Sequence, residues 1–218
     1  MTTIAIDIDD VISPFGDTFL EYYNKKFHTS LSNDDFLEAG EWKNFYETAM
    51  CKIFDTPDSE ELYRNRFVEY LSTDAHAQGQ KIPESTKQAL RRLREQFRLV
   101  VITARDESLS ERTSAWINSE LPDVFEDIYY VGNWRVEQKI TKAEVCLQVG
   151  AEYLIDDNAE HCNIAQQAGV QGILFGDYGW SQNSVADEGV VRLKDWDEVE
   201  TFFAKTVDKP KHNLYNKM

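Results

Sequence analysis

Short apolar runs alternate with helical segments along most of this chain, and this alternation limits the fold more than any other feature. The expected strands cover about residues 3–9, 98–103, 127–131, 151–155, 172–175 and 190–193. The expected helices between and after them cover about residues 83–97, 107–120, 141–149, 159–168 and 195–203. This order predicts an α/β fold, Rossmann-like and doubly wound, whose mostly parallel sheet has helices on both faces.

Residues 14–79 do not follow this alternation. They are rich in aromatic residues, and their apolar positions recur every three or four residues, which is typical of amphipathic helices. We therefore expect a core domain made of residues 1–13 and 80–204, with a small helical insert at 14–79 directly after the first strand. Lysines and Pro210 dominate residues 205–218, which we expect to form a mobile tail.

Charge and cysteine usage limit the possible partners and compartment. The formal net charge of the 218 residues is −16, which argues against nucleic-acid polymers and anionic membranes as partners. The three cysteines are widely spaced and form no metal-binding pattern, so we expect reduced thiols. No signal peptide is apparent, and no apolar run approaches the roughly 20 residues that span a bilayer. We expect a cytoplasmic protein, either a monomer or a homodimer.

Carboxylates gather where two of the expected strands end. Asp7, Asp9 and Asp10 end the first strand, and Asp156 and Asp157 end the strand at 151–155. A single Asp in such a place is most often a turn or capping residue, and Asp157 could cap the helix at 159–168. Because the carboxyl ends of parallel strands meet at one edge of the sheet, the two clusters should converge there. Clustered carboxylates predict a site for a hard cation, and Mg²⁺ suits it best.

Four motifs resemble those of one known superfamily. Asp7-Ile8-Asp9-Asp10-Val11 resembles the first motif of the haloacid dehalogenase (HAD) superfamily, Thr103 after an apolar strand the second, Lys142 the third, and Asp156-Asp157 the fourth. They occur in the order of that superfamily, and the insert at 14–79 falls where its members carry a small cap. The layout is most similar to the branch that contains 5′(3′)-deoxyribonucleotidases.

This resemblance implies an Mg²⁺-dependent phosphomonoesterase. Asp7 would attack phosphorus and form an aspartyl-phosphate. Asp9 would protonate the leaving oxygen and then act as the general base for water. Thr103 would donate to a phosphoryl oxygen, and Lys142 would neutralise the developing charge, although Lys139 is an alternative for this role.

The resemblance also implies a metal site. Mg²⁺ would be held by Asp7, by the backbone carbonyl of Asp9, and by Asp156 or Asp157, between which the sequence does not decide. Asp10 stands where relatives usually have a small residue, often glycine, and we expect it to be a turn or supporting residue.

The substrate is expected to be a small phosphate ester. Thr103, Ala104, Arg105 and Lys142 would lie near the phosphate, although Arg105 could instead form a local ion pair. Phe15 and Trp42 could stack a base, which makes a (deoxy)nucleoside monophosphate a reasonable substrate. A sugar phosphate or another metabolite phosphate is an alternative, and so is a HAD-like protein without catalytic activity. A signalling receiver domain is disfavoured, because receivers are shorter and have no such insert.

Overall fold

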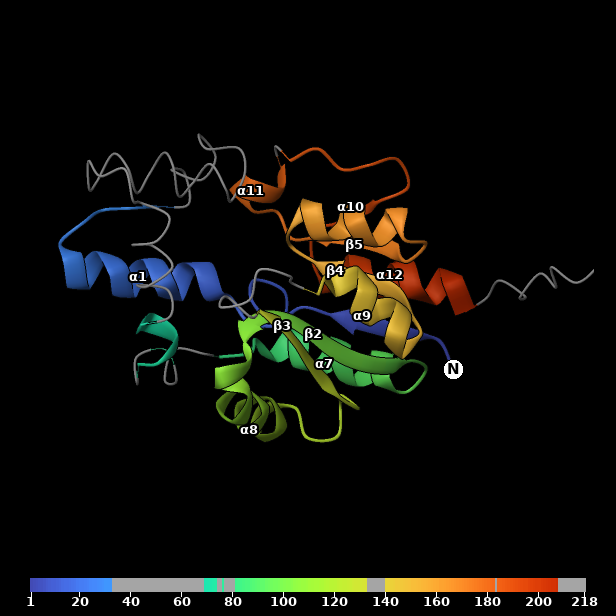
Figure 1. The fold of residues 1–218 in the computed structure, drawn as a ribbon, viewed down its shortest axis with the longest axis horizontal. Helices are drawn as coiled ribbons and strands as arrows, with labels where there is room; N and C mark the ends of the chain where they lie inside the picture. Colours follow the sequence, from blue (N-terminus) through green and yellow to red (C-terminus); the bar gives the residue numbers. More distant parts are fainter. Residues whose placement is uncertain (33–68, 74–75, 77–80, 133–139, 183, 208–218) are drawn as a thin grey trace, which may run out of the picture.

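A computed structural model describes residues 1–32, 69–73, 76, 81–132, 140–182 and 184–207 of the chain. Within these residues the structure is a six-stranded sheet with helices on both sides (Figure 1). No helix in the part of the chain described here is both long and apolar enough to cross a membrane.

The sheet is parallel throughout the described residues. Its strands are β1 (Thr3–Ile6), β2 (Arg98–Asp106), β3 (Ile128–Gly132), β4 (Ala151–Asp156), β5 (Gln171–Phe175) and β6 (Val191–Leu193). They lie in the order β3-β2-β1-β4-β5-β6, and every neighbouring pair is parallel. The predicted doubly wound α/β fold is therefore confirmed.

β1 is shorter than the sequence predicts. The expected strand runs to Asp9, but the observed strand ends at Ile6, because the chain turns back on itself directly afterwards. The carbonyl of Ile8 accepts the N–H groups of Ile12 and Ser13, at 2.9 and 3.0 Å, and these bonds close a tight loop.

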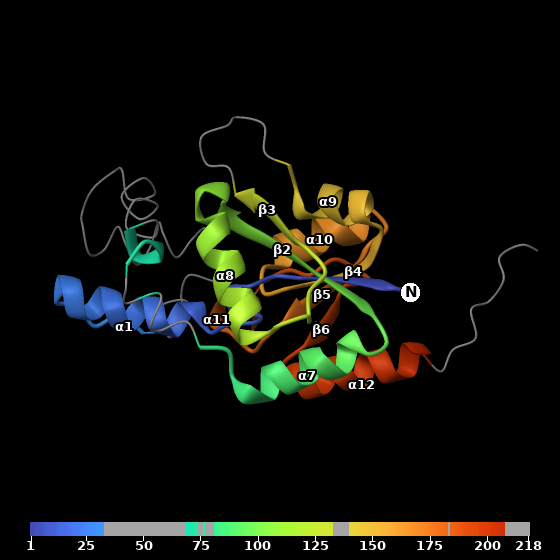
Figure 2. The ribbon, with the colours of Figure 1, turned by 90° about the horizontal axis from the view of Figure 1, so that it is seen from below.

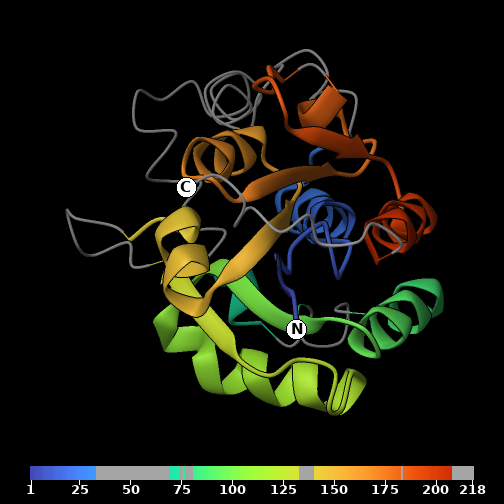
Figure 3. The same ribbon diagram turned by 90° about the vertical axis from the view of Figure 1, so that its right-hand side faces the viewer.

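Helices cover both faces of the sheet, as Figures 2 and 3 show. The helices of the described chain are α1 (Phe15–Phe27), α7 (Glu84–Arg94), the short 3₁₀ helix η2 (Glu107–Leu109), α8 (Ser110–Glu120), α9 (Lys142–Val149), α10 (Ala159–Gln167), α11 (Gly179–Gln182) and α12 (Trp196–Val207). Those that pack on the sheet are α7, α8 and α12 on one face and α9 and α10 on the other. α11 is not predicted from the sequence. α12 continues to Val207, so the prediction of a mobile tail from residue 205 is wrong for its first three residues, and residues 208–218 lie outside the described chain.

The two faces of β1 contact different helices. Ile4 and Ile6 join a buried cluster that includes side chains of α7, α8 and α12. Ala5, which points the other way, joins a cluster with α9 and α10. All three residues are fully buried, and burial of each isoleucine is worth about 1.5–3 kcal/mol. β1 therefore lies at the centre of both cores, and its carboxyl end lies between β2 and β4.

A third cluster lies beyond the carboxyl end of the sheet, around α1. Phe15, Phe19 and Tyr23 pack against Tyr70, in the helical residues 69–71, and against Trp180 of α11. α1 confirms a helix in the first part of the predicted insert. Most of the rest of the insert, including residues 33–68, lies outside the described chain, so its boundaries and its role as a cap stay predictions.

The start of α9 is fixed by a capping box at Thr141. The Thr141 hydroxyl accepts the N–H of Glu144 at 3.1 Å, and the Glu144 carboxylate accepts the N–H of Thr141 at 2.7 Å. These reciprocal bonds satisfy two backbone donors that the helix leaves unpaired.

We expect Thr141→Ala to lower the free energy of unfolding by about 1 kcal/mol, because the cap is lost while the helix remains. Urea unfolding followed by circular dichroism measures this change. Thr141→Ser keeps the hydroxyl and should lose less than half as much. Equal losses in the two variants would show that the methyl group, not the cap, matters here.

Candidate active site

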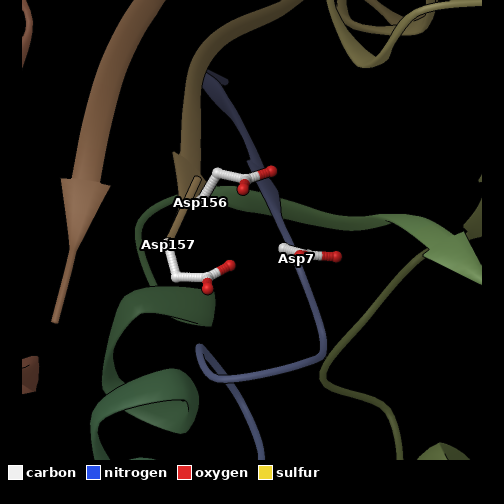
Figure 4. Close-up of side chains that lie close together, drawn as sticks. All are labelled: Asp7, Asp156 and Asp157. Atoms are coloured by element: carbon white, nitrogen blue, oxygen red, sulfur yellow. The ribbon is translucent and has the colours of Figure 1, made fainter. Parts of the chain in front are cut away.

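Three aspartates from two neighbouring strands meet at the carboxyl edge of the sheet. Asp7 directly follows β1, and Asp156 and Asp157 lie at the end of β4 (Figure 4). Ile6 pairs with Ile155, and the N–H of Asp7 donates to the Ile155 carbonyl at 3.0 Å. One carboxylate oxygen from each aspartate lies within 4.8 Å of the others, and all three residues are buried. The parallel pairing of β1 with β4 therefore brings the two predicted carboxylate clusters together.

Lys142 provides a positive charge to this cluster. Its ammonium nitrogen lies 2.9 Å from Asp7 Oδ2 and 2.6 Å from Asp156 Oδ2, and its side chain is buried. Burial alone would lower the pKa of Lys142, but the carboxylates of Asp156 and Asp7 outweigh that effect and raise the pKa above its ordinary value. Lys142 therefore stays charged at any physiological pH. The alternative, Lys139, lies outside the described residues.

Asp156 is occupied by partners within the chain. Besides Lys142, its carboxylate accepts the N–H of Asn158 at 2.9 Å, and the ring nitrogen Nδ1 of His161 lies 3.2 and 3.3 Å from its two oxygens. Burial favours the protonated acid, but Lys142 and then His161 outweigh it and hold the pKa of Asp156 well below its ordinary range. Asp156 thus serves to hold the Lys142 ammonium in place.

Asp157 has a different environment from its neighbour. It does not cap α10, because Asn158 does so by accepting the N–H of Glu160 at 2.8 Å. Instead its Oδ2 accepts the indole N–H of Trp180 at 2.7 Å. Burial and then the charge of Asp156 raise the pKa of Asp157 well above its ordinary value. This carboxylate has fewer protein partners than Asp156 and would benefit more from a cation.

Asp7 has an oxygen that lacks a protein partner. Among the described residues, Asp7 Oδ1 is buried without a hydrogen bond, while Oδ2 contacts Lys142. Burial raises the pKa of Asp7 to about 6, against the opposing attraction of Lys142. When all three carboxylates are ionised, the single ammonium of Lys142 leaves two negative charges, which a divalent cation would balance. Hard oxygen donors with this charge fit Mg²⁺.

The buried Arg105 forms an ion pair with the partly exposed Asp9 beside the triad. Arg105 Nη2 and Nε donate to the two oxygens of Asp9 at 2.7 and 3.0 Å, and the Arg105 side chain is only 2% exposed. Arg105 also contacts the hydroxyl of Thr113 at 3.4 Å and lies over the ring of Trp116. The sequence left two roles open for Arg105, which were binding the substrate phosphate and forming a local ion pair. In this structure Arg105 forms the ion pair.

The remaining predicted residues at this edge lie as follows. Thr103 is buried, and its hydroxyl accepts the N–H of Arg105 at 3.2 Å, whereas Ala104 is exposed. Asp10 has a φ of 58°, and its carboxylate accepts the N–H of Gly16 at 2.9 Å. It therefore acts as a turn residue that also satisfies the start of α1, in agreement with the role expected for it.

Of the two aromatic candidates for stacking a base, the structure describes Phe15, which is not at the triad. Phe15 is 2% exposed and packs against Phe19 and Tyr70, with ring centroids 5.8 and 5.6 Å apart, so its ring belongs to the cluster around α1. Trp42 lies outside the described residues.

Sequence reasoning missed two residues that contact the triad. His161 is in the first turn of α10, four residues after Asp157. The spacing of a helix that begins just after Asp156-Asp157 could therefore have placed it near these aspartates. No local sequence pattern connects Trp180 with Asp157, because Trp180 is in α11, which follows the next strand, β5.

A hollow of about 390 Å³ adjoins the site. Ala104, Lys142 and His161 are among the residues that line it, with backbone of β3 and the start of α9. This volume falls in the range of pockets that bind small molecules.

Comparisons with known proteins agree with this geometry. The model of the family described as 5′ nucleotidase, deoxy (pyrimidine), cytosolic type C protein (NT5C) matches residues 1–207. The chain is 24% identical over 214 residues to YqfW of Bacillus subtilis, which carries a provisional nucleotidase name, covering 98% of this chain and 97% of that one.

Solved structures show the same fold at low identity. A haloacid dehalogenase-like hydrolase of Streptococcus pneumoniae superposes with a TM-score of 0.64 at 15% identity, over 93% of this chain and 98% of that one. YfnB of Bacillus subtilis, provisionally named a HAD hydrolase and solved with magnesium bound, superposes with a TM-score of 0.55 at 16% identity, over 92% and 97% of the two chains.

We expect Arg105→Met to lower the free energy of unfolding by about 2–3 kcal/mol, because it leaves the Asp9 carboxylate without its counter-charge. Urea unfolding measures the loss. Arg91→Met is the matched control, since Arg91 pairs with Glu84 at 3.7 Å on the exposed surface and should cost less than about 1 kcal/mol. Adding Asp9→Asn to Arg105→Met should recover part of the loss, and purely additive losses would contradict the ion pair.

We expect Mg²⁺ affinity to fall as the pH falls through about 6. The metal needs ionised carboxylates, so protons compete for Asp7 below its raised pKa of about 6, and they also compete for Asp157, whose pKa is raised well above its ordinary value. Affinity should fall up to about tenfold per pH unit for each carboxylate that must lose a proton. Calorimetric titrations between about pH 5 and about pH 8 measure this, and a constant affinity over that range would contradict it.

Proposed function

Because this chain belongs to the NT5C family of nucleotidases, which has the HAD fold, we propose that it is an Mg²⁺-dependent phosphomonoesterase acting through an aspartyl-phosphate on Asp7. The observation that carries the proposal is the buried triad of Asp7, Asp156 and Asp157 with the Lys142 ammonium between two of its members. A buried, uncompensated negative charge is costly for stability, which supports a binding role for this cluster.

The residues of the cluster would have two different roles, binding the metal or orienting Lys142, depending on their hydrogen-bond partners. Asp7, Asp157 and the backbone carbonyl of Asp9 would hold Mg²⁺, while Asp156 orients Lys142. Bound Mg²⁺ would supply charge neutralisation for the phosphoryl oxygens. We favour Asp157 over Asp156 as the direct ligand, since the Asp156 oxygens already bind Lys142 and the Asn158 N–H.

The reaction would proceed in two steps. An Asp7 oxygen attacks phosphorus, the bond from phosphorus to the ester oxygen breaks, and that oxygen takes a proton from Asp9. Asp9 then removes a proton from water, which attacks phosphorus, breaks the bond to Asp7 and releases inorganic phosphate. Lys142 stays protonated throughout and stabilises the negative charge near Asp7.

Two further residues would support these steps. Arg105 donates to both oxygens of Asp9, so at least one of these bonds would have to break before a protonated Asp9 could give its proton to the leaving oxygen, while the other would keep the carboxyl group oriented. The Thr103 hydroxyl accepts the N–H of Arg105 and keeps its own proton to donate to a phosphoryl oxygen. The hollow beside Ala104 and Lys142 is the space in this structure that would receive the ester.

The proposed substrates are deoxynucleoside 5′-monophosphates. The family description, with the words nucleotidase, deoxy and pyrimidine, supports this choice. The word cytosolic in that description likewise supports the expected cytoplasmic location. The strongly negative net charge of the chain makes a small ester a better ligand than a nucleic-acid polymer.

The test is phosphate release from deoxyribonucleotides, ribonucleotides, sugar phosphates and an aryl phosphate, with and without Mg²⁺. We expect turnover that requires Mg²⁺, is highest for a deoxyribonucleotide, and falls at least about 10³-fold in Asp7→Asn, which lacks the nucleophile. Asp127→Asn makes the same chemical change at the amino end of the sheet, next to β3, and should keep full activity.

Other outcomes would redirect the proposal. A preference for sugar phosphates would retain the phosphatase and reject the nucleotide. Failure of the folded, Mg²⁺-loaded protein to release phosphate from any ester would reject the enzymatic function and leave a binding role.

A further inference from the structure

Trp180 makes a direct hydrogen bond to one of the proposed metal ligands. Its indole Nε1 donates to Asp157 Oδ2 at 2.7 Å. The Trp180 side chain is only 3% exposed, and Asp157 is buried as well, so water does not compete strongly for this bond. An indole N–H can only donate, and its own protonation does not change with pH.

The position of the indole is fixed by its surroundings. Its ring stacks on Tyr178, with centroids 4.7 Å apart and planes at 6°, and the Tyr178 hydroxyl donates to the carbonyl of Asp10 at 2.8 Å. The hydroxyl of Ser181, the next residue, donates to the carbonyl of Gly176 at 3.1 Å and so ties the segment to the end of β5. Trp180 is also a member of the cluster around α1.

We propose that Trp180 is a positioning residue of the metal site, which holds Asp157 so that a single oxygen, Oδ1, faces the cation. Mg²⁺ requires near-ideal octahedral geometry, which a carboxylate provides best through one oxygen in a fixed direction. Partners that orient metal ligands usually change affinity by about 10–100-fold when they are removed. This inference rests on the proposed function for the assignment of Asp157 as a ligand.

The test compares Mg²⁺ binding by wild type and Trp180→Phe, measured by calorimetry on the metal-free full chain. Phe keeps an aromatic ring in the cluster and removes the N–H donor. We expect binding to weaken by about tenfold or more. A measurement of binding does not depend on turnover.

Trp196→Phe is the matched control. Trp196 is also buried, at 7% exposure, and its Nε1 donates to the backbone carbonyl of Val11 at 3.3 Å, not to a carboxylate. The substitution therefore removes an equivalent bond from the same region of the chain. We expect the Mg²⁺ affinity of this variant to stay within about twofold of wild type.

The outcomes separate the two proposals. If wild type binds Mg²⁺ and Trp180→Phe binds it equally well, or if both variants weaken equally, the role of Trp180 is overturned while the proposed function stands. If wild type does not bind Mg²⁺, the proposed function fails and this inference fails with it.

A second measurement applies if Trp180→Phe does not fold. In ¹⁵N-labelled wild type, the indole N–H resonance of Trp180, assigned through its contacts with the Tyr178 ring, should shift on Mg²⁺ addition more than that of Trp196. An unchanged Trp180 resonance during saturation with Mg²⁺ would overturn the role.

Discussion

The site depends on one buried cation, the Lys142 ammonium between Asp7 and Asp156. Without it, three buried carboxylates would face one another, and their mutual repulsion would add to the cost of removing each from water. Lys142 removes part of this cost, yet the pKa of Asp7 stays raised to about 6 and that of Asp157 stays well above its ordinary value. The negative charge of the ionised carboxylates is therefore only partly compensated by Lys142. This is the physical basis for proposing that the site binds a divalent cation.

The sheet order explains why these groups meet. The chain runs from β1 outward through β2 to β3 and then returns to place β4 on the other side of β1. This change of direction leaves the loop after β1 between the ends of β2 and β4, and such switch points are where doubly wound sheets bind ligands. Asp7 therefore has Asp156 on one side, and Thr103 and Arg105 on the other.

Each charged group at this edge has a partner that limits its orientation. Arg105 holds Asp9, His161 and Asn158 contact Asp156, and Trp180 holds Asp157. Trp180 also belongs to the aromatic cluster around α1, so the same side chain takes part in the packing of α1 and contacts Asp157 of the carboxylate triad. Buried polar networks of this kind are favourable when their members are satisfied, and among the described residues Asp7 Oδ1 is a fully buried carboxylate oxygen without a hydrogen bond.

The sequence by itself determined the α/β class and the approximate positions of all six strands, because local periodicity records which residues face a core and which end a strand. Its motifs also gave Asp7, Asp9, Thr103, Asp156 and Asp157 as candidate site residues, with either Lys142 or Lys139 as the cation. Local patterns were weaker at element ends: the strand expected to run to Asp9 ends at Ile6, and the tail expected from residue 205 begins as the end of α12. Only the tertiary structure decided that Arg105 pairs with Asp9, that Phe15 is buried in a cluster, and that Trp180 contacts Asp157. These contacts join residues far apart in the chain, and their energies depend on burial and distance, which no local pattern of residues contains.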